Sequence, residues 1–400
     1  MSISVPSSPP PLAARDPREY PEGLYIHLPF CAALCTYCDF ARELYGPERP
    51  DRYLRALERE LAAKLRKLHP DGAPYAPRTI YLGGGTPTAL SPGQLGALFD
   101  LIGRHVDASR VEEFTAECNP GSADTGKLEL LRARGVNRVS FGIQSFQPHL
   151  LQLLGRVHGA RDGAEAVRRA RAAGFDNLTV DLMHGLPTQS LEDLRRDLDA
   201  ALALEPEHVS AYGLIYEDGT PLTVAMERGQ FPRPSPEEEA AHYRLVMEAC
   251  EGAGLRMYEI SNYARPGREA RHNSIYWHGE AYLALGVSGA EYVGGERRNN
   301  RRDVSGYLEA IETGGDPIAE RERLGPEARA REALVLALRL REGIDPAAFA
   351  ARWNFDLEAH CGAAFAKFTE LGLLEIAAGG RLRISAAGLP VADAILSELV

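Results

Sequence analysis

The stretch LYIHLPFCAALCTYCDF, residues Leu24–Phe40, holds three of the six cysteines of this 400-residue chain. They stand in the spacing C-x3-C-x2-C, which six randomly placed cysteines would produce about once in a thousand such chains. The alternating residues before them predict a strand, with the cysteines on the loop that follows. Three thiolates on one loop can hold three irons of a [4Fe–4S] cube and leave the fourth iron open. Zinc is the alternative, and His27 is a weak candidate ligand because a strand residue there should face the interior of the fold.

The composition narrows the classes of protein. A formal net charge of −11 argues against nucleic acid as a main partner, since phosphate binding needs basic patches. Residues 1–20 are rich in Pro and Ser and predict a disordered leader. No apolar run is long enough to span a membrane, and clustered reduced cysteines predict a cytoplasmic protein. We expect the isolated Cys118, Cys250 and Cys361 to be small buried hydrophobes, and the basic run Glu296–Asp303 to be a solvated loop.

Beyond the cysteine loop, apolar strands alternate with amphipathic helices, beginning with a helix over Asp51–Leu68. Six strands in such an order predict a parallel sheet with right-handed crossovers, which curls into a partial TIM-like (β/α)6 barrel over residues 21–255. After the first strand, the expected ones are Thr79–Leu82, Glu113–Glu117, Arg138–Ile143, Asn177–Leu182 and Val209–Leu214.

Residues suited to chemistry follow the carboxyl ends of these strands, where a barrel gathers its active site. Gly83–Gly85 could be a turn or could let a ligand approach the backbone closely. Glu117 and Asp181 are single acids in apolar strands, and such acids are usually paired or functional. Gln144 and Arg156 could equally be structural hydrogen-bonding groups.

The last third of the chain predicts two further parts. Residues 256–325 should extend the barrel, and they include the stretch Arg271–Trp277, RHNSIYW. This is either a packed loop with a satisfied histidine or a haem site, with a histidine for iron and aromatic rings for the macrocycle. Residues 326–400 predict three helices and a hairpin, a small α+β winged-helix-like domain. Its third helix has one Lys and no Arg, so we expect a cap or partner surface rather than a DNA reader.

The cysteine motif, with Tyr37 before the third cysteine, resembles the signature of the radical S-adenosylmethionine superfamily. The words YIHLPFC, CDF, SFGIQSF and DLMHGLP resemble the branch that contains oxygen-independent coproporphyrinogen III oxidases and the HemW haem chaperones, over about residues 23 to 300. The resemblance implies a radical SAM barrel with a [4Fe–4S] cluster on Cys31, Cys35 and Cys38, whose open iron chelates S-adenosylmethionine. It places that ligand among Tyr25, Tyr37, Gly84, Gly85, Thr86, Glu117, Gln144, Arg156 and Asp181.

Two functions from different classes are compatible with this branch. One is the oxidative decarboxylation of coproporphyrinogen III, and the other is the carriage of haem to haem-requiring proteins. Phe40 stands where the oxidases have a cysteine, and His272–Trp277 resembles the HNxxYW haem motif of HemW, so both favour the carrier. The carrier function implies that haem binds at His272, Tyr276 and Trp277. It also implies acceptor proteins for the haem and an electron donor for the cluster. Whether the chain is also an enzyme or a homodimer stays open.

Overall fold

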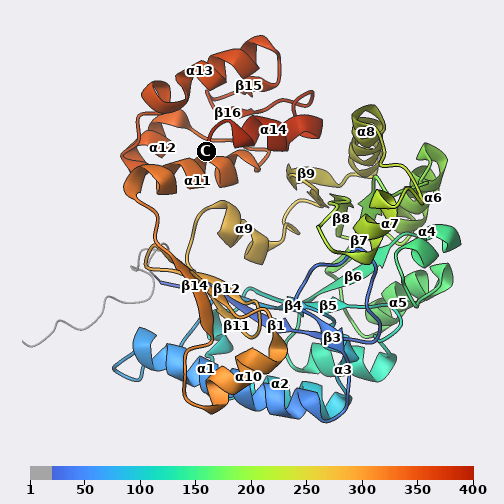
Figure 1. Ribbon diagram of the computed structural model, residues 1–400, viewed down its shortest axis with the longest axis vertical. Coiled ribbons are helices and arrows are strands. Elements are labelled where there is room, and N and C mark those ends of the chain that lie inside the picture. Colours follow the sequence, from blue (N-terminus) through green and yellow to red (C-terminus); the bar gives the residue numbers. More distant parts are fainter. Residues whose placement is uncertain (1–19) are drawn as a thin grey trace, which may run out of the picture.

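The parallel core of the sheet follows the prediction. A computed structural model describes residues 20–400, so the expected leader lies almost wholly outside the described residues (Figure 1). Six parallel strands lie side by side in chain order, each joined to the next by helices. They are β1 (Gly23–Leu28), β4 (Thr79–Gly84), β5 (Glu113–Cys118), β6 (Arg138–Gln144), β7 (Leu178–His184) and β8 (His208–Gly213).

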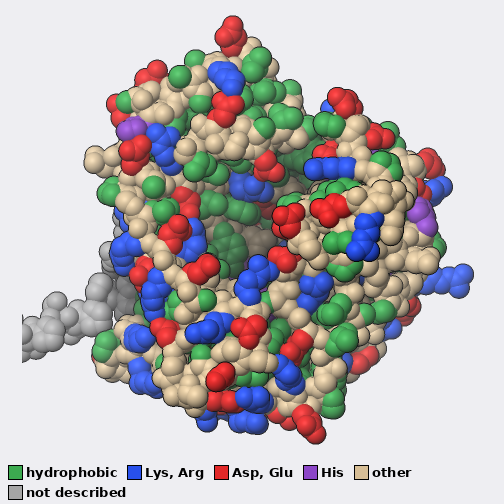
Figure 2. All heavy atoms as spheres, in the orientation of Figure 1, with side chains coloured by type: hydrophobic (Ala, Val, Ile, Leu, Met, Phe, Trp, Pro, Cys, Tyr) green, Lys and Arg blue, Asp and Glu red, His purple; other side chains and the backbone are tan. Residues whose placement is uncertain are grey.

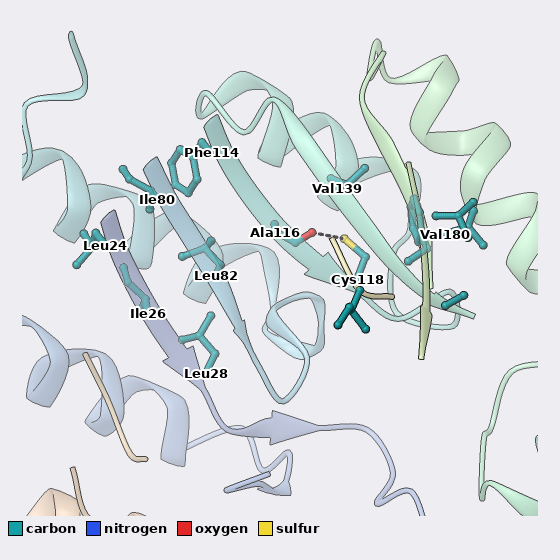
Figure 3. Close-up of a cluster of buried hydrophobic side chains, with 14 of the residues drawn as sticks. Leu24, Ile26, Leu28, Ile80, Leu82, Phe114, Ala116, Cys118, Val139 and Val180 are labelled. Atoms are coloured by element: carbon teal, nitrogen blue, oxygen red, sulfur yellow. Dashed lines mark hydrogen bonds between the residues drawn. The ribbon is translucent and has the colours of Figure 1, made fainter. Parts of the chain in front are cut away.

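Helices cover the outer face of this arc of strands (Figure 1). Alternate residues of β1, β4 and β5, such as Leu24, Ile80 and Phe114, point to this face and are buried in the core between sheet and helices (Figure 3). Several helices begin at capping residues, for example Ser91, whose hydroxyl accepts the amide of Gln94. The helices of this part are α1 (Arg49–Leu68), α2 (Pro92–His105), α3 (Thr125–Ala133), α4 (Pro148–Leu153), α5 (Ala160–Ala172), α6 (Leu191–Leu202), α7 (Pro221–Glu227) and α8 (Pro236–Gly252).

The sheet grows beyond the six strands at both edges. β11 (Tyr282–Leu285) pairs parallel with β1, and β12 (Ala290–Val293), β13 (Glu296–Asn300) and β14 (Ile318–Glu322) follow antiparallel. At the other edge β10 (Asn262–Ala264) pairs with β8, and β9 (Arg256–Glu259) is last. The ends of this 12-stranded sheet, β14 and β9, are not paired with each other, so the barrel is open.

The expectation of a solvated loop at residues 296–303 was wrong for its first half, which forms β13. Arg297 pairs with Glu332 and Glu322, and Arg298 with Glu291 and Glu296. Glu296 lies on β13 itself, whereas the other three acids come from neighbouring strands and a helix, so their contribution is not visible in the local sequence.

The C-terminal part has the predicted helices and hairpin. α11 (Pro326–Leu338), α12 (Pro346–Trp353) and α13 (Leu357–Glu370) precede β15 (Leu374–Ile376), β16 (Leu382–Ile384) and α14 (Ala392–Ser397). This domain packs through α11 on α9 (Arg271–Trp277), which lies between it and the barrel (Figure 1). Among the described residues no helix is both long and apolar enough to cross a membrane.

Candidate functional site

A cavity of about 370 Å³ lies inside the arc of strands and reaches the cysteine loop. Its walls are the inward-facing residues of successive strands, because every second side chain of a strand points to the same face. They include Tyr81 of β4, Glu117 of β5, Ser140 of β6, Asp181 of β7 and Ser210 of β8. The space-filling view shows the molecule hollowed between the C-terminal domain and the barrel, with hydrophobic side chains inside the hollow (Figure 2).

All three cysteines of the motif line this cavity, as free thiols. The loop that carries them is tied to the end of α4, because the amide and hydroxyl of Thr36 donate to the carbonyl oxygens of Leu154 (3.1 Å) and Leu153 (2.8 Å). Within residues 20–400, no three Cys, His, Asp or Glu side chains are close enough to hold a single metal ion. A [4Fe–4S] cluster does not need three ligands on one ion, because each thiolate binds a different iron. Three thiols around one cavity fit this arrangement.

Two polar groups approach the sulfurs. Arg156 Nη1 donates to Cys35 Sγ at 3.3 Å, and its other nitrogen donates to the carbonyl oxygen of Gly142. Thr86 Oγ1 lies 3.9 Å from Cys31 Sγ. A guanidinium at this distance gives a sulfur ligand a charge-assisted hydrogen bond. This donor set therefore suits an iron–sulfur cluster with an anionic ligand shell.

Two half-buried acids line the cavity. Glu117 accepts hydrogen bonds from Tyr81 Oη (2.7 Å) and the amide of Gly84 (3.1 Å), while burial raises its pKa to about 7. Asp181 accepts from Ser140 Oγ at 2.9 Å, and burial raises its pKa to about 6 although hydrogen bonds oppose the shift. Acids with such pKa values can ionise when a cationic ligand enters, so they suit a ligand with a positive charge.

The glycine-rich turn after β4 is needed for close packing as well as for the cavity. Gly84 has φ +104°, and a Cβ there would lie 2.5 Å from the His27 ring. A Cβ on Gly85 would lie 2.7 Å from the Leu28 carbonyl oxygen. His27 is itself buried and hydrogen-bonded to the carbonyl oxygen of Ala41 (2.8 Å), not to a cysteine. Any side chain at Gly84 would therefore disturb the end of β1 before it met a ligand.

The structure gathers most of the residues expected around S-adenosylmethionine. Tyr25 is the exception, since it is not a lining residue and its hydroxyl hydrogen-bonds His27 Nδ1 at 3.1 Å. Gln144 reaches the cavity from the end of β6, where the register with β7 shifts. The expected residues that line the cavity are Tyr37, Gly84, Gly85, Thr86, Glu117, Gln144, Arg156 and Asp181.

Further lining residues were not predicted. They include Tyr81, Arg138, Ser140, Ser210, Tyr212 and Asn273. The strand residues among them could have been found from the sequence, because they alternate with buried core residues along β4, β6 and β8 and so face the cavity. Asn273 has no such signal, since its place depends on where α9 packs. No residue from 326 to 400 lines the cavity, so the role of the C-terminal domain as a cap or a partner surface stays a prediction.

The predicted haem motif forms α9, which lies across the amino ends of β4 and β5. Glu113 accepts the backbone amides of Arg271 (2.8 Å) and His272 (3.1 Å). The ring nitrogens of His272 hydrogen-bond Thr79 Oγ1 and Tyr276 Oη, both at 2.7 Å, and the side chain is 1% exposed. Trp277 packs under Arg339 of the C-terminal domain. The guanidinium carbon of Arg339 lies 4.9 Å from the centre of the Trp277 ring.

In this placement His272 is not free to ligate iron, and its role as a haem ligand stays a prediction. Both of its ring nitrogens already have partners in the conformation described, and burial lowers its pKa to about 3, so the ring is neutral. A neutral imidazole offers one donor and one acceptor, which matches two hydroxyl partners. The alternative of a satisfied histidine in a packed segment describes this state, although the segment is a helix rather than a loop.

Comparisons with known proteins agree with this geometry. Residues 25–201 match the family model of the radical SAM superfamily, and residues 324–391 match that of the HemN C-terminal domain. The chain is 39% identical to the "Heme chaperone HemW" of Bacillus subtilis over 88% of this chain and 92% of that one. It is 37% identical to the protein of the same name from Mycobacterium tuberculosis, over 95% of both chains.

Among solved structures, the fold is similar to that of coproporphyrinogen III oxidase (HemN) from Escherichia coli. The TM-score is 0.83 at 23% sequence identity, over 96% of this chain and 91% of the oxidase. This likeness covers both the barrel and the C-terminal domain, but at such identity it establishes the fold alone. The curated relatives are closer in sequence over the same length, and the chain therefore belongs to the HemW family of the radical S-adenosylmethionine superfamily.

Proposed function

We propose that this protein binds haem and passes it to haem-requiring acceptor proteins, while carrying a [4Fe–4S] cluster and S-adenosylmethionine. The observation that carries the proposal is the identity of 37–39% to haem chaperones over 88–95% of the chain. Such coverage includes the cysteine loop, α9 and the C-terminal domain together. Coproporphyrinogen III oxidase shares the fold but not this level of identity, so it is the alternative to be tested.

In the proposal, Cys31, Cys35 and Cys38 hold three irons of the cluster. When bound, the cluster supplies an electron to S-adenosylmethionine at its open iron. The protein's own part is electrostatic. Arg156 donates a hydrogen bond to Cys35 Sγ, and the carboxyl groups of Glu117 and Asp181 line the cavity that would hold the positively charged sulfonium ligand. Cysteine thiolates and an exposed iron are stable in a reducing compartment, such as the cytoplasm, with a donor protein to reduce the cluster.

For haem, the proposal keeps His272 as the axial ligand but assigns that role to a second conformation. Ligation requires α9 to move away from Thr79 and the Glu113 carboxylate, because these contacts bury the ring. α9 has seven residues and its amino end is held by one carboxylate, which favours such a movement over unfolding of a strand. Tyr276 and Trp277 then become available as aromatic cover for the macrocycle.

The test is to incubate the anaerobically reconstituted protein with haem and, in parallel, with coproporphyrinogen III. A carrier forms a stoichiometric haem complex that loses its haem to an added apo-haem protein, and it releases no CO₂ from coproporphyrinogen III. Decarboxylated product, formed with consumption of S-adenosylmethionine, would replace the carrier by the oxidase. A protein with Cys35→Ala serves as the control that lacks the cluster.

A further inference from the structure

Arg138 is a buried guanidinium that faces the cavity without a partner. It is 3% exposed, lines the cavity, and its Nε is buried with no hydrogen-bond partner. Among residues 20–400, no acceptor hydrogen-bonds or forms an ion pair with this side chain. A charged side chain in such a place is destabilising unless something pairs with it. The mechanism outlined above does not use it.

The acids nearest to Arg138 are already engaged. Glu113 and Asp181 act on it through space, but Glu113 holds the amides at the start of α9 and Asp181 holds the hydroxyl of Ser140. Neither acid reaches ion-pair distance of the guanidinium. The positive charge is therefore balanced only at long range in the ligand-free protein.

Other unpartnered polar atoms lie around the same inner end of the barrel. Thr115, the direct register partner of Arg138 on β5, has a buried hydroxyl without a partner. The hydroxyl of Thr179 and Nδ1 of His208, paired across β7 and β8, are also buried without a partner. These three residues do not line the cavity, whereas Arg138 does, and Asn273 lines it from α9. Buried polar groups in native proteins are nearly always satisfied, so the exposure of Arg138 to the cavity indicates a bound group that supplies its missing hydrogen bonds.

This inner end is separate from the cysteine loop. Arg138 begins β6, two residues before Ser140, so it lies about 7 Å deeper along the barrel than the layer of Ser140 and Asp181, since strands rise about 3.3 Å per residue. It also lies close enough to His272 for its charge to lower the pKa of that histidine. A ligand group here would thus be near α9 and away from the irons.

We propose that the inner end of the cavity is a carboxylate-binding site, in which the guanidinium of Arg138 pairs with a carboxylate of the bound ligand. The planar guanidinium matches a carboxylate with two parallel hydrogen bonds, and Asn273 can donate a third from its carboxamide. The inference rests on the proposed function for its source of a carboxylate, which is a propionate of haem, because the family resemblance gives the carboxylate of S-adenosylmethionine to the open iron of the cluster.

The experiment compares haem with haem dimethyl ester, in which both propionates are neutral. Dissociation constants are measured on the reconstituted full chain, for the wild type, Arg138→Met and Arg138→Lys. Arg169→Met is the matched control, because Arg169 also has a buried Nε without a partner but does not line the cavity. Melting temperatures show that each variant folds, and Arg138→Gln, which also lacks the charge, replaces Arg138→Met if the latter does not fold.

We expect Arg138→Met to weaken the binding of haem by about tenfold to a hundredfold and to leave the binding of haem dimethyl ester unchanged, as loss of a charge-assisted hydrogen bond predicts. Equal weakening of haem and of its dimethyl ester, or no effect on either, overturns the site. Failure of the wild type to bind either form of haem overturns the proposed function, and this site with it.

Discussion

Thr79→Val and Tyr276→Phe should make haem bind more tightly if His272 becomes the axial ligand only after α9 leaves the barrel. Each substitution keeps the shape of the side chain and removes a hydroxyl that hydrogen-bonds a ring nitrogen of His272 at 2.7 Å. The haem-free state loses these hydrogen bonds, whereas the haem-bound state does not contain them. The closed conformation is therefore destabilised relative to the one that binds.

The magnitude follows from the two contacts. A buried hydrogen bond contributes about 1 kcal/mol, and an unsatisfied buried partner raises the loss to about 1–3 kcal/mol. Since about 1.4 kcal/mol changes an equilibrium constant tenfold, the population of the released state should rise about fivefold to a hundredfold. The apparent dissociation constant for haem should fall by the same factor while the released state remains a minority.

The assay is a haem titration followed at the Soret band, with urea unfolding of the haem-free protein on the same samples. The expected pattern is tighter haem binding together with lower stability in both hydroxyl variants, and loss of the wild-type Soret band in His272→Ala. Thr179→Val is a matched control, because its hydroxyl is also buried in the barrel but has no partner. Unchanged or weaker haem binding in Thr79→Val and Tyr276→Phe, with a wild-type spectrum in His272→Ala, would refute the release of α9 and place the haem ligand elsewhere.

Three other results are expected. Alanine at Cys31, Cys35 or Cys38 should abolish the [4Fe–4S] absorption and iron content, whereas alanine at the buried Cys118, Cys250 or Cys361 should leave about four irons per chain, measured after anaerobic reconstitution. Burial raises the pKa of Glu117 from 4.5 to about 7, so the folded chain holds this proton more tightly than the unfolded chain. The proton on Glu117 therefore contributes its full stabilisation below about pH 4.5, and this stabilisation is lost as the pH rises through about 7. The unfolding free energy of the wild type should fall by up to about 3 kcal/mol between pH 5 and pH 8 for this reason, and Glu117→Gln should not show this part of the fall. Gly84→Ala should lower the melting temperature and the iron content together, because the new Cβ meets the His27 ring, and His27→Ala should restore part of both; S-adenosylmethionine affinity that falls in Gly84→Ala at full stability would show that ligand contact dominates instead.

Local patterns were enough to predict the part of the site that rests on strand periodicity. Residues at the carboxyl ends of parallel strands converge whatever the helices between them do, which is why Glu117, Asp181 and the cysteine loop could be brought together from the sequence. The same periodicity contains Ser140 and Ser210, which stand on the inward face but carry small hydroxyls that do not draw attention in an apolar strand. Tyr25 also points inward, yet its hydroxyl is satisfied by His27 and does not line the cavity.

Contacts between distant segments could not be predicted. His272 depends on Thr79, which is 193 residues away in the chain, so the sequence alone could not show that the histidine is buried. β13 is similar, because its arginines look solvated until Glu291 and Glu332 are placed beside them. Arg138 has the inward periodicity of β6, but its lack of a partner could not be predicted, since a charged residue that begins a strand usually faces water.

The contacts of α9 also link the barrel to the C-terminal domain. Arg339 covers the ring of Trp277, and Arg352 Nη2 donates to the carbonyl oxygen of His278 at 3.2 Å. Neither contact lines the cavity, yet both must break or move with α9 before His272 can leave Thr79. The stability of α9 in the closed state is thus the sum of contacts on both of its sides, and a change at the interface with residues 326–400 acts on His272 without touching the cluster. Under the proposed movement of α9, access to the haem motif and assembly of the cysteine site depend on different parts of the molecule, which allows a shared radical SAM barrel to serve a carrier.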